Sequence, residues 1–185
     1  MAILHIELQA DTGAGIAKVT DEPITEPEAI KAFLANVGIH YERWDVAIQL
    51  ATDASEEDIL SAYEAHLVPY MTRNGYQTAD VISIHPGTAD YPSIRAKFLA
   101  EHTHSEDEVR FFVSGEGLFW FNLKGQAVFN VLCQQGDLIS VPKNTKHWFD
   151  AGESAPNVNA IRMFSDMAGW VPHYTGSGIE SKFSA

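Results

Sequence analysis

The stretch EHTHSEDEVRFFVSGEGLFWF, residues 101–121, orders its ionisable and apolar side chains in a way that decides the fold. His102 and His104 are two residues apart, so in an extended chain both project to the same side. Glu108 and Arg110 share that parity. If this ionisable face points inward, the segment builds a site inside a barrel.

The opposite face of the same segment is apolar and carries Val109, Phe111 and Val113. A strand with one polar and one apolar face is typical of a sheet that separates two environments. The alternation holds across Ser105–Asp107 only if no turn or bulge intervenes there.

A second segment, GDLISVPKNTKHWF at 136–149, could return another histidine to the same cavity. Gly136 and Pro142 punctuate a strand, turn and strand that lead to His147. A His-x-His pair alone is weak evidence, because eight histidines produce such pairs by chance and solvated surface histidines are the alternative. The combined pattern predicts one metal site, with four ligands: His102, His104, Glu108 and His147.

The predicted ligand set restricts the metal and its use. Imidazoles with one carboxylate suit iron, nickel, cobalt, copper, manganese or zinc, and the single cysteine argues against an iron–sulfur or structural zinc site. Four protein ligands on a six-coordinate ion leave two positions for a chelating substrate, which a catalytic metal needs. Metal affinity should fall as the pH drops toward the ordinary histidine pKa of about 6.5.

Other residues are weaker candidates for the site. Arg110 could neutralise an anionic substrate oxygen, support a ligand from outside, or form a structural ion pair. Glu101 is either an outer partner of the ligands or an exposed acid. Phe98, Phe149 and Trp170 could wall a substrate pocket or simply belong to the core.

Three features are interpreted as structural. Gly115 and Gly117 predict a hairpin turn, because no helix follows to make a phosphate loop. Cys133 is expected to be a small buried residue. The remaining histidines have no partner pattern and should be structural or exposed: His5, His40, His66, His85 and His173.

From Asp80 onward the sequence predicts a series of short strands separated by turn residues. Lys124 and Gly125 mark one hairpin within it. The series favours a closed antiparallel barrel. The strands are expected at DVISIH, EVRFFV, LFWFNL, AVFNVL, DLISV, KHWFD and NAIRMF.

Two amphipathic helices precede the strands and should pack on the outside of the barrel. The first begins near Pro27, ends before Gly38, and repeats apolar residues at Ile30, Phe33, Leu34 and Val37. The second begins with a capping-box pattern at Ser55 and Asp58, and Pro69 should kink or end it. Its apolar face consists of Ile59, Tyr63, Leu67 and Met71.

Length and composition bound the remaining possibilities. The 185 residues fit one domain, 1–185, with a helical flanking region at about 25–75 and a barrel at about 80–165. A net charge of -13 disfavours nucleic acid and anionic membranes as partners. One cysteine and no basic leader indicate a cytoplasmic protein, and we expect a monomer.

These motifs resemble those of the cupin superfamily, G…HxHxxxE…G followed by G…P…H. Gly115 closes the first motif here, and the second motif often has glycine where this chain has Asn144, a residue that tolerates a left-handed backbone. Further segments resemble the acireductone dioxygenase family: ERWD at 42–45, RAKFLAEHTHSEDEVRFFVSGEGLF from 95, and GWVP at 169–172.

The resemblance implies a mainly β fold, the cupin double-stranded β-helix or jelly-roll barrel, with N-terminal helices packed outside. It also implies one Fe2+ or Ni2+ per chain, no organic cofactor, and a small-molecule acireductone and O2 as reaction partners in methionine salvage. Arg110 would contact the anionic oxygens of the substrate, while Phe98, Phe149, Arg162 and Trp170 would shape its pocket.

The family substrate is 1,2-dihydroxy-3-keto-5-methylthiopentene, which the resemblance implies is cleaved in one of two ways. The iron form yields 4-methylthio-2-oxobutanoate and formate, and the nickel form yields 3-methylthiopropionate, formate and carbon monoxide. Two alternatives stay open: another cupin dioxygenase or metal-dependent isomerase, and a non-catalytic small-molecule-binding cupin. Oxygen consumption separates the enzyme hypotheses from one another. Loss of metal ligands is typical of the non-catalytic cupins.

Overall fold

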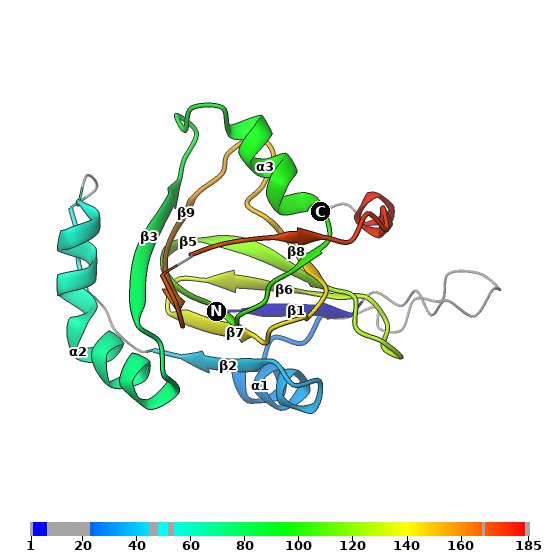
Figure 1. Cartoon of the computed structure of the whole chain (residues 1–185), viewed down its shortest axis with the longest axis horizontal. Helices are drawn as coiled ribbons and strands as arrows, with labels where there is room; N and C mark the ends of the chain where they lie inside the picture. Colours follow the sequence, from blue (N-terminus) through cyan, green and yellow to red (C-terminus); the bar gives the residue numbers. More distant parts are fainter. Residues whose placement is uncertain (1, 7–22, 45–47, 52–53, 168, 184–185) are drawn as a thin grey trace.

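The computed structural model describes residues 2–6, 23–44, 48–51, 54–167 and 169–183 and shows a mainly antiparallel β structure with helices on its outside (Figure 1). Asp45 of the ERWD segment lies outside this part. The elements are β1 (Ile3–Ile6), α1 (Pro27–Asn36), β2 (His40–Arg43), α2 (Glu56–Asn74), β3 (Thr78–Ile84), α3 (Tyr91–Leu99), β4 (His102–Thr103), β5 (Glu108–Phe121), β6 (Phe129–Gln134), β7 (Asp137–Val141), β8 (His147–Asp150), β9 (Val158–Phe164), β10 (His173–Tyr174) and the 3-10 helix η1 (Ile179–Lys182).

The strands form two layers that share β5. One layer has the order β1-β6-β5-β8-β4-β10, and the other follows the pairings β2-β7-β5-β9-β3. All of these pairings are antiparallel. The predicted cupin β fold is therefore confirmed, and β5 is the element on which both layers depend.

The predicted hairpin at Gly115 and Gly117 is wrong, because β5 runs straight through both residues. The register against β9 shifts between Phe112 and Ser114, and β5 passes from one layer to the other between Gly115 and Glu116. Gly115 has φ +73, and an added Cβ would lie 1.9 Å from the backbone oxygen of Asn157. This glycine therefore lies just beyond the bulge, at the point where β5 changes partners within one long strand.

The bulge changes which residues of β5 point into the barrel. Phe112 before it and Phe119 and Phe121 after it share the central core, although their parity differs. Phe111, in contrast, packs outward against α2. The predicted hairpin at Lys124–Gly125 is confirmed, since β5 and β6 pair antiparallel across it.

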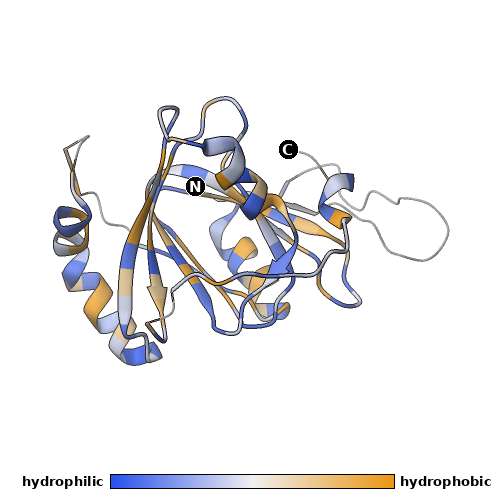
Figure 2. Ribbon diagram, turned by 45° about the horizontal axis from the view of Figure 1, so that its top comes forward, coloured by the Kyte–Doolittle hydropathy of each residue, from blue (hydrophilic) through white to orange (hydrophobic). Residues whose placement is uncertain are grey.

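Both predicted helices are confirmed. Ser55 caps α2: its hydroxyl accepts from the backbone N–H of Asp58, while the Asp58 carboxylate accepts from the backbone N–H of Ser55. Pro69 does not end α2, which continues to Asn74 and buries Tyr70 beyond the proline. Tertiary packing thus outweighs the lost backbone hydrogen bond. Figure 2 shows both hydrophobic and hydrophilic residues along α2, and its buried residues, Ile59, Tyr63, Leu67 and Tyr70, follow one another at helical spacing.

Several short elements were not predicted: β1, β2, β4, β10, α3 and η1. Of these, α3 matters most for the site because it carries Phe98. Its Arg95 binds both carboxylate oxygens of Asp150 at 2.8 Å, which fastens α3 to β8. No helix in the described part of the chain is long and apolar enough to span a bilayer.

Candidate metal centre

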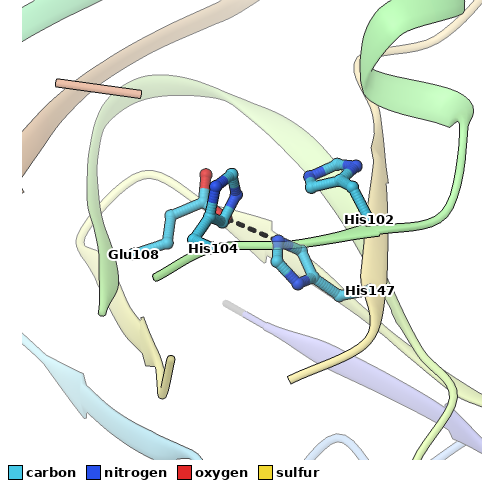
Figure 3. A group of neighbouring side chains, drawn as sticks. All are labelled: His102, His104, Glu108 and His147. Atoms are coloured by element: carbon cyan, nitrogen blue, oxygen red, sulfur yellow. Dashed lines mark hydrogen bonds and ion pairs between the residues drawn. The ribbon is translucent and has the colours of Figure 1, made fainter. Parts of the chain in front are cut away.

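Four buried side chains from three segments converge on one point inside the barrel (Figure 3). His102 and His147 are direct neighbours across β4 and β8, and Glu108 is the first residue of β5. His104 follows β4. Each side chain offers one ligand atom, and these atoms all lie within 4.8 Å of one another. The structure therefore brings together the four residues that the sequence singled out.

Backbone carbonyls orient all three imidazoles. The Nδ1 atoms of His102 and His147 lie 2.7 and 2.8 Å from the carbonyl oxygens two residues before them. The Nδ1 atom of His104 lies 2.8 Å from the carbonyl of Val171, far along the chain. A carbonyl oxygen only accepts, so each Nδ1 carries the hydrogen and each neutral ring keeps its lone pair on Nε2.

The remaining ligand atoms fit a metal cation. Nε2 of His147 lies 2.7 Å from a carboxylate oxygen of Glu108, and Nε2 of His104 lies 3.5 Å from the same oxygen. Lone pairs and a carboxylate this close repel one another unless a cation or proton lies between them. The buried Nε2 of His104 also has no hydrogen-bond partner among the described residues. Imidazoles fixed through Nδ1 are characteristic of metal ligands.

The electrostatics keep Glu108 and His102 in the forms that bind a metal. Burial alone would raise the pKa of Glu108, but the Arg110 guanidinium and the contacts with His104 and His147 lower it well below its ordinary value. Burial, with a contribution from His147, lowers the pKa of His102 to about 4. At neutral pH Glu108 is therefore ionised and His102 is neutral, as coordination requires.

Arg110 lies beside the ligands and is only 1% exposed. Its Nη2 lies 2.6 Å from a carboxylate oxygen of Glu108, whereas Nε and Nη1 have no hydrogen-bond partner in the described structure. The guanidinium carbon lies 4.4, 5.1 and 5.6 Å from the ring centres of Phe149, Phe119 and Phe98. A cation between aromatic faces is stabilised without using its N–H donors, so the two nitrogens Nε and Nη1 stay free to donate to an anion.

A small cavity adjoins the ligands. Its volume is about 30 Å3, and its lining includes His104, Glu108 and Trp170. The centre of the Trp170 ring lies 5.5 Å from the ring centres of both His102 and His104, and 5.1 Å from that of Phe98. A cavity of this size, with ionisable groups in its lining, has room for water beside the candidate ligands.

The sequence matches the ARD/ARD' family over residues 12–172. The chain belongs to this family. A relative from Picosynechococcus, called acireductone dioxygenase, is 62% identical over 89% of this chain and 93% of its own length. Another of that name from Acidiphilium cryptum is 49% identical over 99% of this chain and 98% of its own length.

A solved structure gives the same family relationship. The acireductone dioxygenase from Bacillus anthracis, described with a cadmium ion in its active centre, superposes with a TM-score of 0.77. It is 32% identical and covers 94% of this chain and 98% of its own. That relative holds a metal ion at its centre, and this ARD/ARD' family member has a ligand group that could hold one.

Arg162 is the pocket candidate whose guanidinium is paired with a carboxylate outside the candidate metal centre. It pairs with Arg110 across β5 and β9, but its Nε and Nη2 bind both carboxylate oxygens of Asp80 at 2.8 and 2.6 Å. Like Arg110, Phe98 and Phe149, it does not line the small cavity beside the candidate ligands. Its positive charge acts on Arg110 from the neighbouring strand.

Glu101 is buried rather than exposed, with 2% of its surface accessible. Its carboxylate accepts hydrogen bonds from Asn122 at 2.6 Å, from Ser177 at 2.7 Å, and from Thr175. Burial alone would raise the pKa of Glu101, but these hydrogen bonds lower it. Glu101 thus fastens the segment around Thr175 to the strand that carries His102, a role that its place in the sequence did not reveal.

Two contributors to this family member's site were not singled out from the sequence, although both lie in segments that resemble the family. Phe119 packs against Arg110 and Phe149, but the pattern marked it only as a strand residue. Val171 acts through its backbone carbonyl, which any residue could supply. The other described histidines, His40, His66, His85 and His173, are exposed, and Cys133 is fully buried with a raised pKa caused by that burial.

Proposed function

We propose that this chain is a metal-dependent acireductone dioxygenase, which cleaves 1,2-dihydroxy-3-keto-5-methylthiopentene with O2 in methionine salvage. The ligands would be His102, His104, Glu108 and His147. The observation that carries the proposal is the convergence of three imidazoles, each fixed through Nδ1, on one ionised carboxylate. Relatives called acireductone dioxygenase cover almost the whole chain.

Each residue near the ligands has a distinct part in this proposal. A bound metal would supply Lewis acidity and redox chemistry to a chelating substrate. Arg110 is the proposed catalytic residue, since its free N–H donors can hold an anionic substrate oxygen within a dry site. Phe98, Phe149 and Trp170 would wall the substrate and exclude water.

Two further residues would act from outside this pocket. Arg162 would act on the pocket only through Arg110 on the neighbouring strand, since its own guanidinium is paired with Asp80. Glu101 would support the ligands indirectly, by holding the C-terminal segment against β4. Both assignments rest on charge and on hydrogen bonds rather than on contact with the cavity.

The metal would decide the products. We propose one Fe2+ or Ni2+ per chain and no organic cofactor, with iron giving 4-methylthio-2-oxobutanoate and formate. Nickel would give 3-methylthiopropionate, formate and carbon monoxide. The intrinsic affinity of such a site rises from iron to nickel, so metal supply would influence which reaction prevails. We also propose a single-domain, monomeric, cytoplasmic enzyme, a setting in which the free thiol of Cys133 is stable.

The test is to prepare apoprotein, reload it separately with Fe2+ and Ni2+, and supply acireductone in air. Oxygen uptake is recorded with an electrode, and the products are identified by mass spectrometry and gas analysis. We expect uptake with both metals and carbon monoxide only with nickel. Absence of oxygen uptake with either metal would refute the assignment.

A further inference from the structure

Gly117 lies in β5 on the inward side, and its role differs from that of Gly115. Gly115 has a positive φ, which side chains rarely adopt, whereas the φ of Gly117 lies in the range open to any residue. The backbone at Gly117 therefore does not need glycine for its conformation. The reason for glycine here must be space.

The space is occupied by the ring of Phe149. A Cβ added at Gly117 would lie 2.1 Å from Cζ and 2.4 Å from Cε2 of that ring, which no real contact allows. Phe149 is the cross-strand partner of Phe119, so Gly117 and Phe149 are diagonal neighbours on the inward face of β5 and β8. Because Gly117 has no side chain, the Phe149 ring can occupy this position.

The Phe149 ring cannot absorb a methyl group by a small shift. It is 1% exposed, and its centre lies 4.9 Å from that of Phe119 and 6.1 Å from that of Phe98. The guanidinium carbon of Arg110 lies 4.4 Å from the centre of the same ring, which is the shortest of its three distances to aromatic rings. In an interior packed this closely, a displaced ring moves toward the guanidinium or its aromatic neighbours.

We propose that Gly117 is a positioning residue for anion binding: it seats Phe149 against Arg110, so that the two free donors of Arg110 are held toward the substrate. This inference rests on the proposed function and adds a determinant outside the ligands and the pocket wall. Gly117 itself contacts no ligand group. Its effect should therefore appear in substrate binding rather than in metal content.

The first test is Gly117→Ala in the metal-loaded enzyme. We expect metal content per folded protein to be unchanged, and KM for acireductone to rise about 10-fold or more, because hydrogen bonds to charged groups have at least this effect. Gly87→Ala is the matched control. Its added Cβ also meets an aromatic side chain, that of His85 at 3.3 Å, but on an exposed turn. It should leave KM unchanged.

A double-mutant cycle separates positioning from general damage, and the comparison made within the Phe149→Leu background still tests the proposal if Gly117→Ala alone folds poorly. Phe149→Leu removes the ring atoms that the methyl group would strike. We expect Gly117→Ala to change KM less than 2-fold in the Phe149→Leu background, since coupled neighbours are not additive. An equal rise in KM in both backgrounds would overturn the proposal.

A second readout needs no turnover. In the zinc-loaded 15N-labelled protein, the Nε–H signal of Arg110, assigned through Arg110→Lys, carries the ring-current shift of Phe149. Gly117→Ala should move this signal, and Gly87→Ala should not. An unmoved signal would refute the positioning role. If the wild type consumed no oxygen while the signal moved as expected, the proposed reaction would fail and the positioning would stand.

Discussion

The two faces of β5 before its bulge are equally buried but chemically opposite. Glu108 and Arg110 point inward and are 4% and 1% exposed, while Val109 and Phe111 point outward and are each 1% exposed. The inward pair stands among metal-binding side chains and aromatic rings. The outward pair lies in a hydrophobic cluster beneath α2.

This difference shows that burial alone does not specify what a position must contain. The outward face is stabilised by apolar packing. For example, the centre of the Phe111 ring lies 5.1 Å from the ring centre of Tyr63 on α2 and 4.6 Å from that of Trp44. The inward face is stable only if each buried charge has an opposite charge or a hydrogen-bond partner, because burying an unpaired charge costs a large amount of free energy. Function and stability should therefore respond to different faces of one strand.

The largest expected effect is loss of the metal on the inward face. Glu108→Gln replaces the only carboxylate of the group, so we expect retained iron or nickel to fall below one-tenth of the wild-type amount after dialysis. Elemental analysis by mass spectrometry measures it. Glu116→Gln, on the same strand but exposed, is the control and should retain the metal. Full retention of the metal in Glu108→Gln would show that the inward face of β5 does not bind the metal through this carboxylate.

The outward face should show the reverse behaviour. Phe111→Ala should lower the free energy of unfolding by about 3–5 kcal/mol, because it leaves a cavity beneath α2. Urea denaturation measures this change, and Val68→Ala on the exposed side of α2 should have little effect. The folded fraction of Phe111→Ala should bind metal normally. A loss of metal from that fraction would mean that the two faces are coupled.

A smaller effect is expected at Arg110, where the inward face meets the substrate. Arg110→Lys keeps the charge but removes the planar fork of donors, so we expect kcat/KM to fall roughly 10- to 100-fold. The metal content should stay at the wild-type level. Steady-state kinetics and elemental analysis on the same preparations check both statements. Unchanged kcat/KM would show that the two free donors of Arg110 do not act on the substrate.

The smallest effect concerns α2, which covers the outward face. The hydrogen bonds from the Ser55 hydroxyl and backbone lower the pKa of Asp58, so the cap stabilises the protein above the ordinary aspartate pKa and loses this effect as pH falls through the lowered value. Ser55→Ala should therefore reduce stability more at pH 7 than at pH 3. Thermal unfolding at both values measures the difference. An equal change at both would exclude a role for the Asp58 charge.

Much of the local structure follows from the sequence because its signals are local. The capping residues of α2, the apolar repeat of α1 and the turn at Gly125 each act within a few residues. Asn144 adopts φ 64, a left-handed conformation that its residue type allows. The four candidate ligands were also predicted from the sequence, His102 and His104 by their spacing of two, and Glu108 and His147 only by the combined motifs.

Tertiary structure alone decided what depends on distant segments. The turn signal at Gly115 and Gly117 was overridden because β5 finds partners on both sides of its bulge, and Asn157 and Phe149 occupy the space that side chains would need. The burial of Glu101 depends on residues more than 70 positions along the chain. Local patterns thus determine which residues can serve, while packing between distant segments determines which of them meet.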